Sequence, residues 1–88
     1  MSGPMCARRN CTKHATKQPV LTFAAIIAPN GPRGRAELGM YVCEEHALPD
    51  PTEYITDISW QIIVTSMRAN GRADPCRRTC RIEFNTLQ

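Results

Sequence analysis

Two pairs of metal-binding residue types constrain this chain of 88 residues more than any other feature. Four residues separate Cys6 from Cys11, two separate Cys43 from His46, and 31 lie between the two pairs. Three thiolates and one imidazole are the donor set of many closed, tetrahedral Zn²⁺ sites. We therefore predict a structural zinc site formed by Cys6, Cys11, Cys43 and His46.

The sequence also allows a second ligand set. His14 follows Cys11 by the same two-residue gap that separates His46 from Cys43. These four residues would also make a tetrahedral site, and Cys6 would then be free. We prefer the set with Cys6, because three thiolates hold Zn²⁺ strongly. A third interpretation is that the cysteines are simply buried thiols.

The small size of the chain explains why a metal would be useful. A single domain of this length, covering residues 1–88, buries only about 60 to 65% of the surface that its unfolded chain exposes. The aromatic residues available for a core are few: Phe23, Phe84, Tyr41, Tyr54 and Trp60. A structural zinc site supplies on the order of 10 to 16 kcal/mol of apparent binding free energy, which counts toward folding.

The cysteine count and the N-terminal residues indicate a reducing compartment. Five cysteines cannot all pair in disulfides, and residues 1–11 lack the apolar run of a signal peptide. No stretch approaches the 18 consecutive apolar residues of a membrane span. We expect a cytoplasmic protein without a membrane segment.

A hairpin is the natural interpretation of the first half of the chain. Residues 20–28 form an apolar, partly β-branched run of strand length, and residues 29–34 are a cluster of turn-forming types. A second short strand, 37–42, then leads directly into Cys43. Closing this hairpin would carry Cys43 and His46 back to the first ligand pair.

A helix over residues 50–70 is predicted next. Asp50 can cap it, with Pro51 in its first turn, and Gly71 follows its end. Its expected apolar stripe consists of Ile55, Ile58, Ile62 and Ser66, flanked by Ser59, Ile63 and Met67. Because residues 54–65 are rich in β-branched types, a strand is the alternative.

The remaining residues, 71–88, form a basic tail in which 79–87 can add a third strand. We therefore predict an α+β domain made of a zinc loop and hairpin over 6–47, a helix over 50–70 and this tail. Within the tail, Cys76 and Cys80 lie among arginines that would favour thiolates. They indicate either a redox pair or ordinary thiols in a turn.

The order of these features resembles the treble-clef arrangement of zinc fingers. A Cys pair, a hairpin and a second ligand pair ahead of a helix follow one another over residues 6–47. The stretch 41–47 is similar to the second half-site of small zinc proteins with a Cys-x4-Cys then Cys-x2-His pattern, common in actinobacteria and their phages. The resemblance implies a zinc-stabilised fold and the ligand set that includes Cys6; it implies no activity. The four-residue first gap and the 48–51 break before the helix depart from the commonest treble clefs.

Charge is distributed unevenly along the chain. Residues 1–35 carry six Lys or Arg and no acid, 36–67 carry six acids and no Lys or Arg, and 68–88 carry five Arg and two acids. If the basic parts converge they make a face for nucleic-acid phosphates. The candidate residues are Arg8, Arg9, Arg33, Arg35, Arg77, Arg78 and Arg81. Alternatively, the basic and acidic parts pair with one another.

Two functional hypotheses result, and neither is enzymatic. The first is a zinc-stabilised module that binds nucleic acid or regulates, through arginine contacts with phosphate. The second is a protein-interaction adaptor or inhibitor, of phage or host-regulatory type, that uses the helix or a strand edge, with Trp60 as an anchor if it is exposed. Catalysis is not expected, because His14 is the only histidine outside the preferred site and no phosphate-binding loop is present. We expect no small-molecule substrate.

Overall fold

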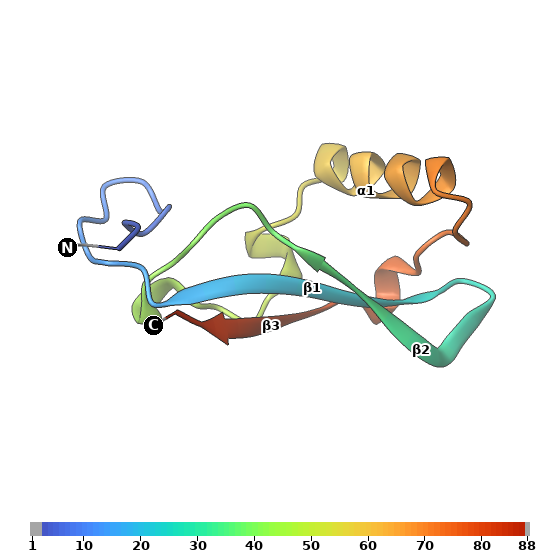
Figure 1. Cartoon of the computed structure of the whole chain (residues 1–88), viewed down its shortest axis with the longest axis horizontal. Helices are drawn as coiled ribbons and strands as arrows, with labels where there is room; N and C mark the ends of the chain where they lie inside the picture. The colour runs from blue at the N-terminus through green and yellow to red at the C-terminus, as the bar shows by residue number, and fades with distance from the viewer. Residues whose placement is uncertain (1–2, 88) are drawn as a thin grey trace.

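A three-stranded antiparallel sheet covered on one face by a single helix forms the body of the molecule (Figure 1). The computed structural model describes residues 3–87. The main elements are β1 (Lys17–Ala25), β2 (Ala28–Glu37), α1 (Asp57–Ala69) and β3 (Arg81–Thr86). This arrangement confirms the α+β class. Three short 3-10 turns, η1 (Glu44–His46), η2 (Pro51–Glu53) and η3 (Arg77–Thr79), complete the fold.

Strand β1 is the centre of the sheet, in the order β2-β1-β3. Leu21 is fully buried and lies opposite Ala36 of β2 and Ile82 of β3. Its neighbour Phe23 is also buried. The predicted third strand is therefore confirmed. It pairs with β1 and not with β2, the other strand of the hairpin.

The position of the hairpin turn was predicted wrongly. The chain reverses at Ile26 and Ile27, so β1 covers 17–25 and not 20–28, and the residues of the expected turn at 29–34 belong to β2. The register of the β1–β2 pairing shifts next to this turn, because Ala24 lies opposite Arg33 whereas Ala25 lies opposite Ala28. The proline- and glycine-rich cluster thus bulges an edge strand, where missing backbone donors are tolerated.

Strand β2 also ends earlier than predicted. It stops at Glu37, and residues 38–41 form an irregular segment before Cys43. Within β2, Gly34 lies opposite Phe23, and a Cβ there would come 3.0 Å from the Phe23 Cε2 atom. A glycine therefore lets the aromatic ring lie across the edge strand.

The helix begins later than predicted. Asp50 caps only η2, by accepting a hydrogen bond of 3.0 Å from the Thr52 N–H. Helix α1 starts at Asp57, after a capping box in which Thr56 and Ser59 each bind the other's backbone N–H. The strand alternative for 54–65 is wrong, because 57–69 is helical. Within residues 3–87, no helix has the length and apolar character that a membrane crossing requires.

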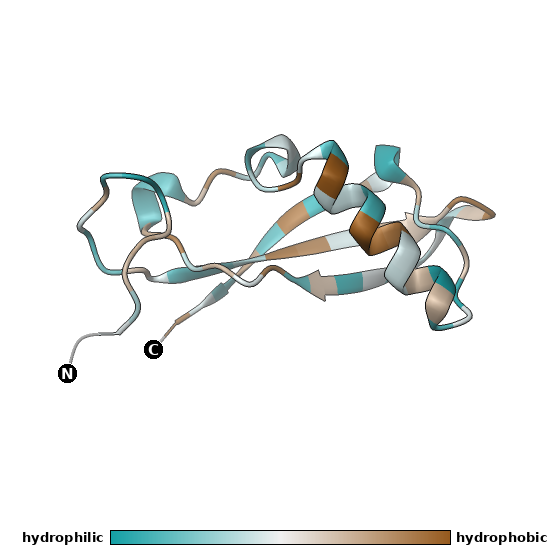
Figure 2. Cartoon of the chain, turned by 90° about the horizontal axis from the view of Figure 1, so that it is seen from above, coloured by the Kyte–Doolittle hydropathy of each residue, from teal (hydrophilic) through white to brown (hydrophobic). Residues whose placement is uncertain are grey.

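The buried face of α1 differs from the predicted one at Ile58 and Ile62, although the flanking residues Ile63 and Met67 pack against the core. Trp60 and Val64 are buried against the sheet, whereas Ile58 and Ile62 remain 76% and 65% exposed. Figure 2 shows the hydrophobic bands that result on the helix ribbon. Trp60 packs in the core and is not an exposed anchor. Apolar residues lie on both sides of the helix, so periodicity did not identify the side that packs.

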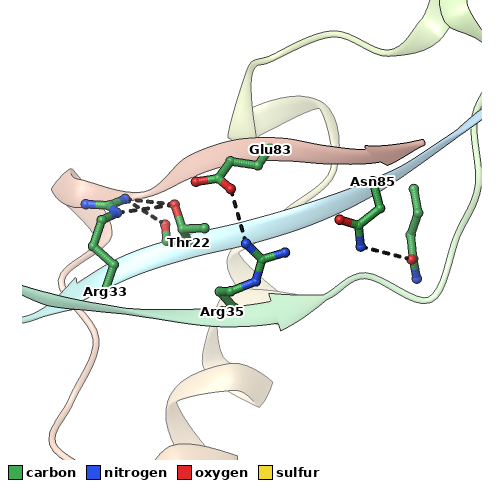
Figure 3. Close-up of polar contacts among 6 residues, drawn as sticks. Thr22, Arg33, Arg35, Glu83 and Asn85 are labelled. Carbon is green, nitrogen blue, oxygen red and sulfur yellow. Dashed lines mark hydrogen bonds and ion pairs between the residues drawn. The ribbon is translucent and has the colours of Figure 1, made fainter.

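Polar side chains line the sheet face opposite α1 (Figure 3). The Arg33 guanidinium donates hydrogen bonds to the Thr22 hydroxyl and carbonyl and to the Thr79 carbonyl. Arg35 reaches Glu83 across β1, at 3.2 Å. These long side chains cover β1 from the side that no helix protects.

Candidate metal centre

The first pair of donor residues lies in a tight loop. The Cys11 N–H donates a hydrogen bond of 3.1 Å to the Arg8 carbonyl and closes a turn between the two cysteines. Asn10, just before Cys11, has a φ of 65°, in the left-handed region where Asn is among the better-tolerated residues. The turn aims Cys6 and Cys11 at the same point.

The second pair is set by the 3-10 turn η1. Cys43 precedes this turn, and the His46 N–H donates to the Cys43 carbonyl at 3.1 Å. The Tyr54 hydroxyl donates to the His46 carbonyl at 3.0 Å and holds the turn from outside. This contact could not be predicted from the sequence, because nothing in the ligand spacing points to Tyr54.

Backbone hydrogen bonds join the two loops. Val42 forms an isolated antiparallel bridge with Lys17, and its carbonyl also accepts from the Thr16 N–H at 2.9 Å. The Ala7 N–H donates to the Tyr41 carbonyl at 2.8 Å. The start of β1 therefore aligns both ligand pairs.

The four predicted donors come together with the spacing of a metal shell. Their ligand atoms all lie within 4.8 Å of one another. The sulfurs of Cys11 and Cys43 are 3.8 Å apart, and the Nδ1 of His46 lies 3.4 Å from the Cys6 sulfur and 3.2 Å from that of Cys43. A tetrahedral zinc ion with ordinary bond lengths would separate two sulfurs by about 3.8 Å and a sulfur and a nitrogen by about 3.6 Å. The residues present therefore match a tetrahedral metal ion.

The charges of the thiols also favour a cation at this point. Burial raises the pKa of Cys6, but hydrogen bonds from the Cys43 and Arg8 backbone and from the His46 ring outweigh it and lower the pKa to about 6. The Lys13 backbone lowers the pKa of Cys11, yet burial and the neighbouring Cys6 and Cys43 sulfurs raise it above its ordinary value on balance. Thiolates this close repel one another, and a bound cation removes that repulsion.

The other candidate metal and redox residues lie outside this cluster. His14 is exposed and pairs with Met5 in a β-bridge, so the structure does not assemble the alternative ligand set. Cys76 and Cys80 flank η3. All five cysteines are free thiols. Burial raises the pKa of Cys80, and the nearby arginines offset only part of that rise, so the expected thiolate character is wrong for Cys80.

Four of the seven candidate phosphate-binding arginines have partners within the chain. Arg8 pairs with Glu53 at 2.8 Å, and Arg77 pairs with Asp57 at 2.7 Å. Arg33 and Arg35 take part in the sheet contacts described above. Arg77 also stacks over the Trp60 ring, with its guanidinium carbon 5.8 Å from the ring centre. Two of these arginines, Arg8 and Arg77, therefore neutralise acids of the middle of the chain.

The other three arginines, Arg9, Arg78 and Arg81, form no ion pair among the described residues. They do not share one surface. Arg9 lies in the donor loop at one end of the molecule, whereas Arg78 lies in η3 near the other end of the long axis, which measures 43 Å (Figure 1). The expected convergence of the metal loop with the tail is therefore not found.

No family model, curated protein or solved structure matches the chain. The resemblance to small zinc-finger proteins stays a prediction, and the treble-clef arrangement is not confirmed. Both ligand pairs occur in loops joined by the sheet, but α1 begins well after His46 and contributes no donor.

Proposed function

We propose that the chain is a zinc-stabilised binding module in which Zn²⁺ has a structural role. The observation that carries the proposal is the cluster of Cys6, Cys11, Cys43 and His46, whose donor atoms all lie within 4.8 Å of one another. Thiolates and imidazole select Zn²⁺ over hard cations such as Mg²⁺ or Ca²⁺. The treble-clef resemblance supports the same metal.

A binding role follows better than a catalytic one from this donor set. Four protein ligands fill a tetrahedral shell and leave no position for a reactive water or a substrate. The free thiols of the cluster also favour a reducing compartment such as the cytoplasm, where they would stay available to the metal.

The outward side of α1 is the surface best suited to a partner, and we propose a protein as that partner. Ile58 and Ile62 are exposed on it, within a shallow surface that also includes Thr65 and Ala69. Exposed apolar patches of this kind on small domains mark interaction sites more often than isolated apolar residues do. This is the adaptor hypothesis, with Ile58 and Ile62 in the role first considered for Trp60.

Nucleic acid is the second candidate partner. The strand register places Arg35 and Arg81 on either side of Thr22 on the sheet face opposite α1, and Arg78 follows in η3. The guanidinium groups of arginines on this face can reach phosphates. Val20, Thr22 and Ala24 of β1 point to the same face and offer no aromatic ring on which a base could stack. Such binding would therefore be weak and independent of sequence.

Metal analysis of freshly purified protein tests the zinc proposal. We expect one zinc per chain in the wild type and in His14→Ala, and its loss in Cys6→Ser. The opposite pattern for the two variants would move the site to the alternative ligand set. Apoprotein that stays compact and unfolds cooperatively in excess EDTA would contradict a structural role for the metal.

Two binding assays separate the candidate partners. In affinity capture from a host lysate, Ile58→Lys/Ile62→Lys should lose proteins that the wild type and the control Ile27→Lys retain. In filter binding to duplex DNA, contacts with about three phosphates predict that log K falls with log salt concentration at a slope near −2.7. In Arg78→Ala/Arg81→Ala the magnitude of this slope should fall by about 2. Binding weaker than about 100 μM at low salt would exclude a nucleic-acid role.

A further inference from the structure

Four residues form a straight apolar strip along the outward side of α1: Ile58, Ile62, Thr65 and Ala69. Their spacing of four, three and four residues is that of a coiled-coil seam. At about 100° per residue the strip lies opposite the side that Trp60 buries against the sheet. All four strip residues are exposed, so no described part of the chain covers the strip.

The strip has large side chains in its first half and small ones in its second. An antiparallel copy of the same helix would place Ile58 against Ala69 and Ile62 against Thr65, so that each isoleucine meets a small residue. We propose that this strip binds the same strip of a second copy of this chain, with the two α1 helices antiparallel about a twofold axis. The inference rests on the proposed function, because it names the protein that the outward side of α1 binds.

Charges beside the strip match the same arrangement. Asp57, Gln61 and Arg68 lie on one flank of the strip, with the acid at its start and the base near its end. In an antiparallel twofold pair, like flanks meet, so Asp57 of one copy lies beside Arg68 of the other. A parallel pair would instead bring opposite flanks together, so that neither Asp57 nor Arg68 would lie beside a charge of opposite sign from its own flank. The charges therefore select the antiparallel orientation as well.

The atoms needed for this contact are available. Arg77 binds only the Oδ1 of Asp57, whose side chain is 90% exposed. Arg68 uses its Nε and Nη2 for Asp74 and keeps Nη1 for a further acceptor. A contact between Asp57 Oδ2 and Arg68 Nη1 of the other copy would join two existing ion pairs into a network without breaking either.

The size of the strip sets the expected affinity. A helix of 13 residues is roughly 20 Å long. Two such strips bury less than the roughly 1,200 Å² at the lower limit of stable complexes. We therefore expect a reversible dimer with a Kd on the order of 100 μM.

Sedimentation equilibrium of the zinc-loaded protein from about 10 to 500 μM tests the proposal. We expect the weight-average mass to rise from monomer toward dimer, and Ile62→Lys to abolish the rise. Ile27→Lys is the matched control, because Ile27 is even more exposed (83% against 65% for Ile62) but lies on the β1–β2 turn. A monomer at all concentrations, or a dimer that Ile62→Lys leaves intact, would overturn the proposal.

A size exchange tests the antiparallel orientation. Ala69→Ile alone should weaken association about tenfold, because the larger side chain at position 69 would then meet Ile58 of the other copy, and Ile58→Ala/Ala69→Ile should restore it. Failure of the double variant to recover would overturn the antiparallel pairing.

Zinc content is measured on the same samples. A monomer that keeps its zinc would reject the dimer and leave the zinc-stabilised module standing, whereas a folded protein without zinc would reject the module itself.

Discussion

The two ends of this molecule are held together in different ways. The metal end, residues 5–16 and 41–46, has no helix longer than one turn, and its most buried side chains include the donors Cys6 and Cys43. The sheet and helix region, β1–β3 with α1, buries Leu21, Phe23 and Trp60 in an apolar core. The comparison teaches that a small chain can combine a candidate metal centre at one end with apolar packing at the other.

The two regions meet at Val42. This residue is 1% exposed, belongs to the apolar cluster and also bridges Lys17 at the start of β1. Its neighbour Cys43 is a candidate metal donor and a member of the same apolar cluster. Residues 42 and 43 therefore join the two regions.

Removal of a donor should have the largest effect. We expect Cys43→Ser to lose the metal, to cost more than about 5 kcal/mol and to remove amide protection at Cys6, Thr16 and Val42, because metal binding supplies the folding free energy of this end. Zinc analysis measures the loss of metal, and hydrogen exchange measures the loss of amide protection. Cys76→Ser, the same substitution outside the cluster, should keep both zinc and protection. Unchanged amide protection at these three residues in Cys43→Ser would show that the metal end does not need a bound ion.

A core truncation should destabilise the other region while leaving the metal in place. Leu21 is fully buried, so Leu21→Ala should lower the free energy of unfolding by about 3 kcal/mol. Urea denaturation measures this loss, with zinc content followed at room temperature. Ile27→Ala, at an exposed site, should change stability by less than about 0.5 kcal/mol. Loss of zinc from folded Leu21→Ala would show that the two regions are not separable.

Loss of the α1 cap should be smaller still. The Thr56 hydroxyl accepts from the Ser59 N–H at 3.1 Å, and Thr56→Ala should cost about 1 kcal/mol without affecting the metal. Thr65→Ala makes the same change at an exposed mid-helix position and should be nearly neutral. Thermal unfolding of both variants compares them, and equal effects would argue against the cap.

The smallest effect concerns a surface ion pair at the metal end. The hydrogen bond from Lys13 lowers the pKa of Glu45, so in Lys13→Ala that pKa should rise toward the ordinary value of a Glu side chain. The pair stabilises the fold above the ordinary Glu pKa, and this contribution disappears as the pH falls through the lowered value. An NMR titration of Glu45 measures the shift. Lys17→Ala should leave Glu45 unchanged, because Lys17 binds Thr86 instead.

Local patterns predicted the candidate site better than the fold. The spacing of Cys6, Cys11, Cys43 and His46 pointed to the site because each ligand pair lies in one short loop, although spacing alone also allowed His14. The α+β class and the third strand also followed from local signals. The spatial distribution of the arginines could not be predicted, because it depends on how the sheet orders its strands.

The wrong predictions about the fold share a cause. Turn-forming residues 29–34 suit either a hairpin turn or a bulged edge strand, and only pairing with β1 decides between them. Asp50 and Thr56 are both good caps, and the longer helix follows the second. On α1, Ile58 and Trp60 compete for the core, and the shape of the sheet selects Trp60. Each choice depends on tertiary contacts that no local pattern contains.

The central position of β1 has a consequence for synthesis of the chain. Leu21 pairs with Ala36, which follows soon after it, but its other neighbour, Ile82, is translated only after the metal end and α1. A ribosome-bound chain that has already closed its donor loops therefore still carries a hydrophobic strand with one unpaired edge. Such an edge is a target for chaperones and for unwanted pairing between nascent chains until β3 arrives.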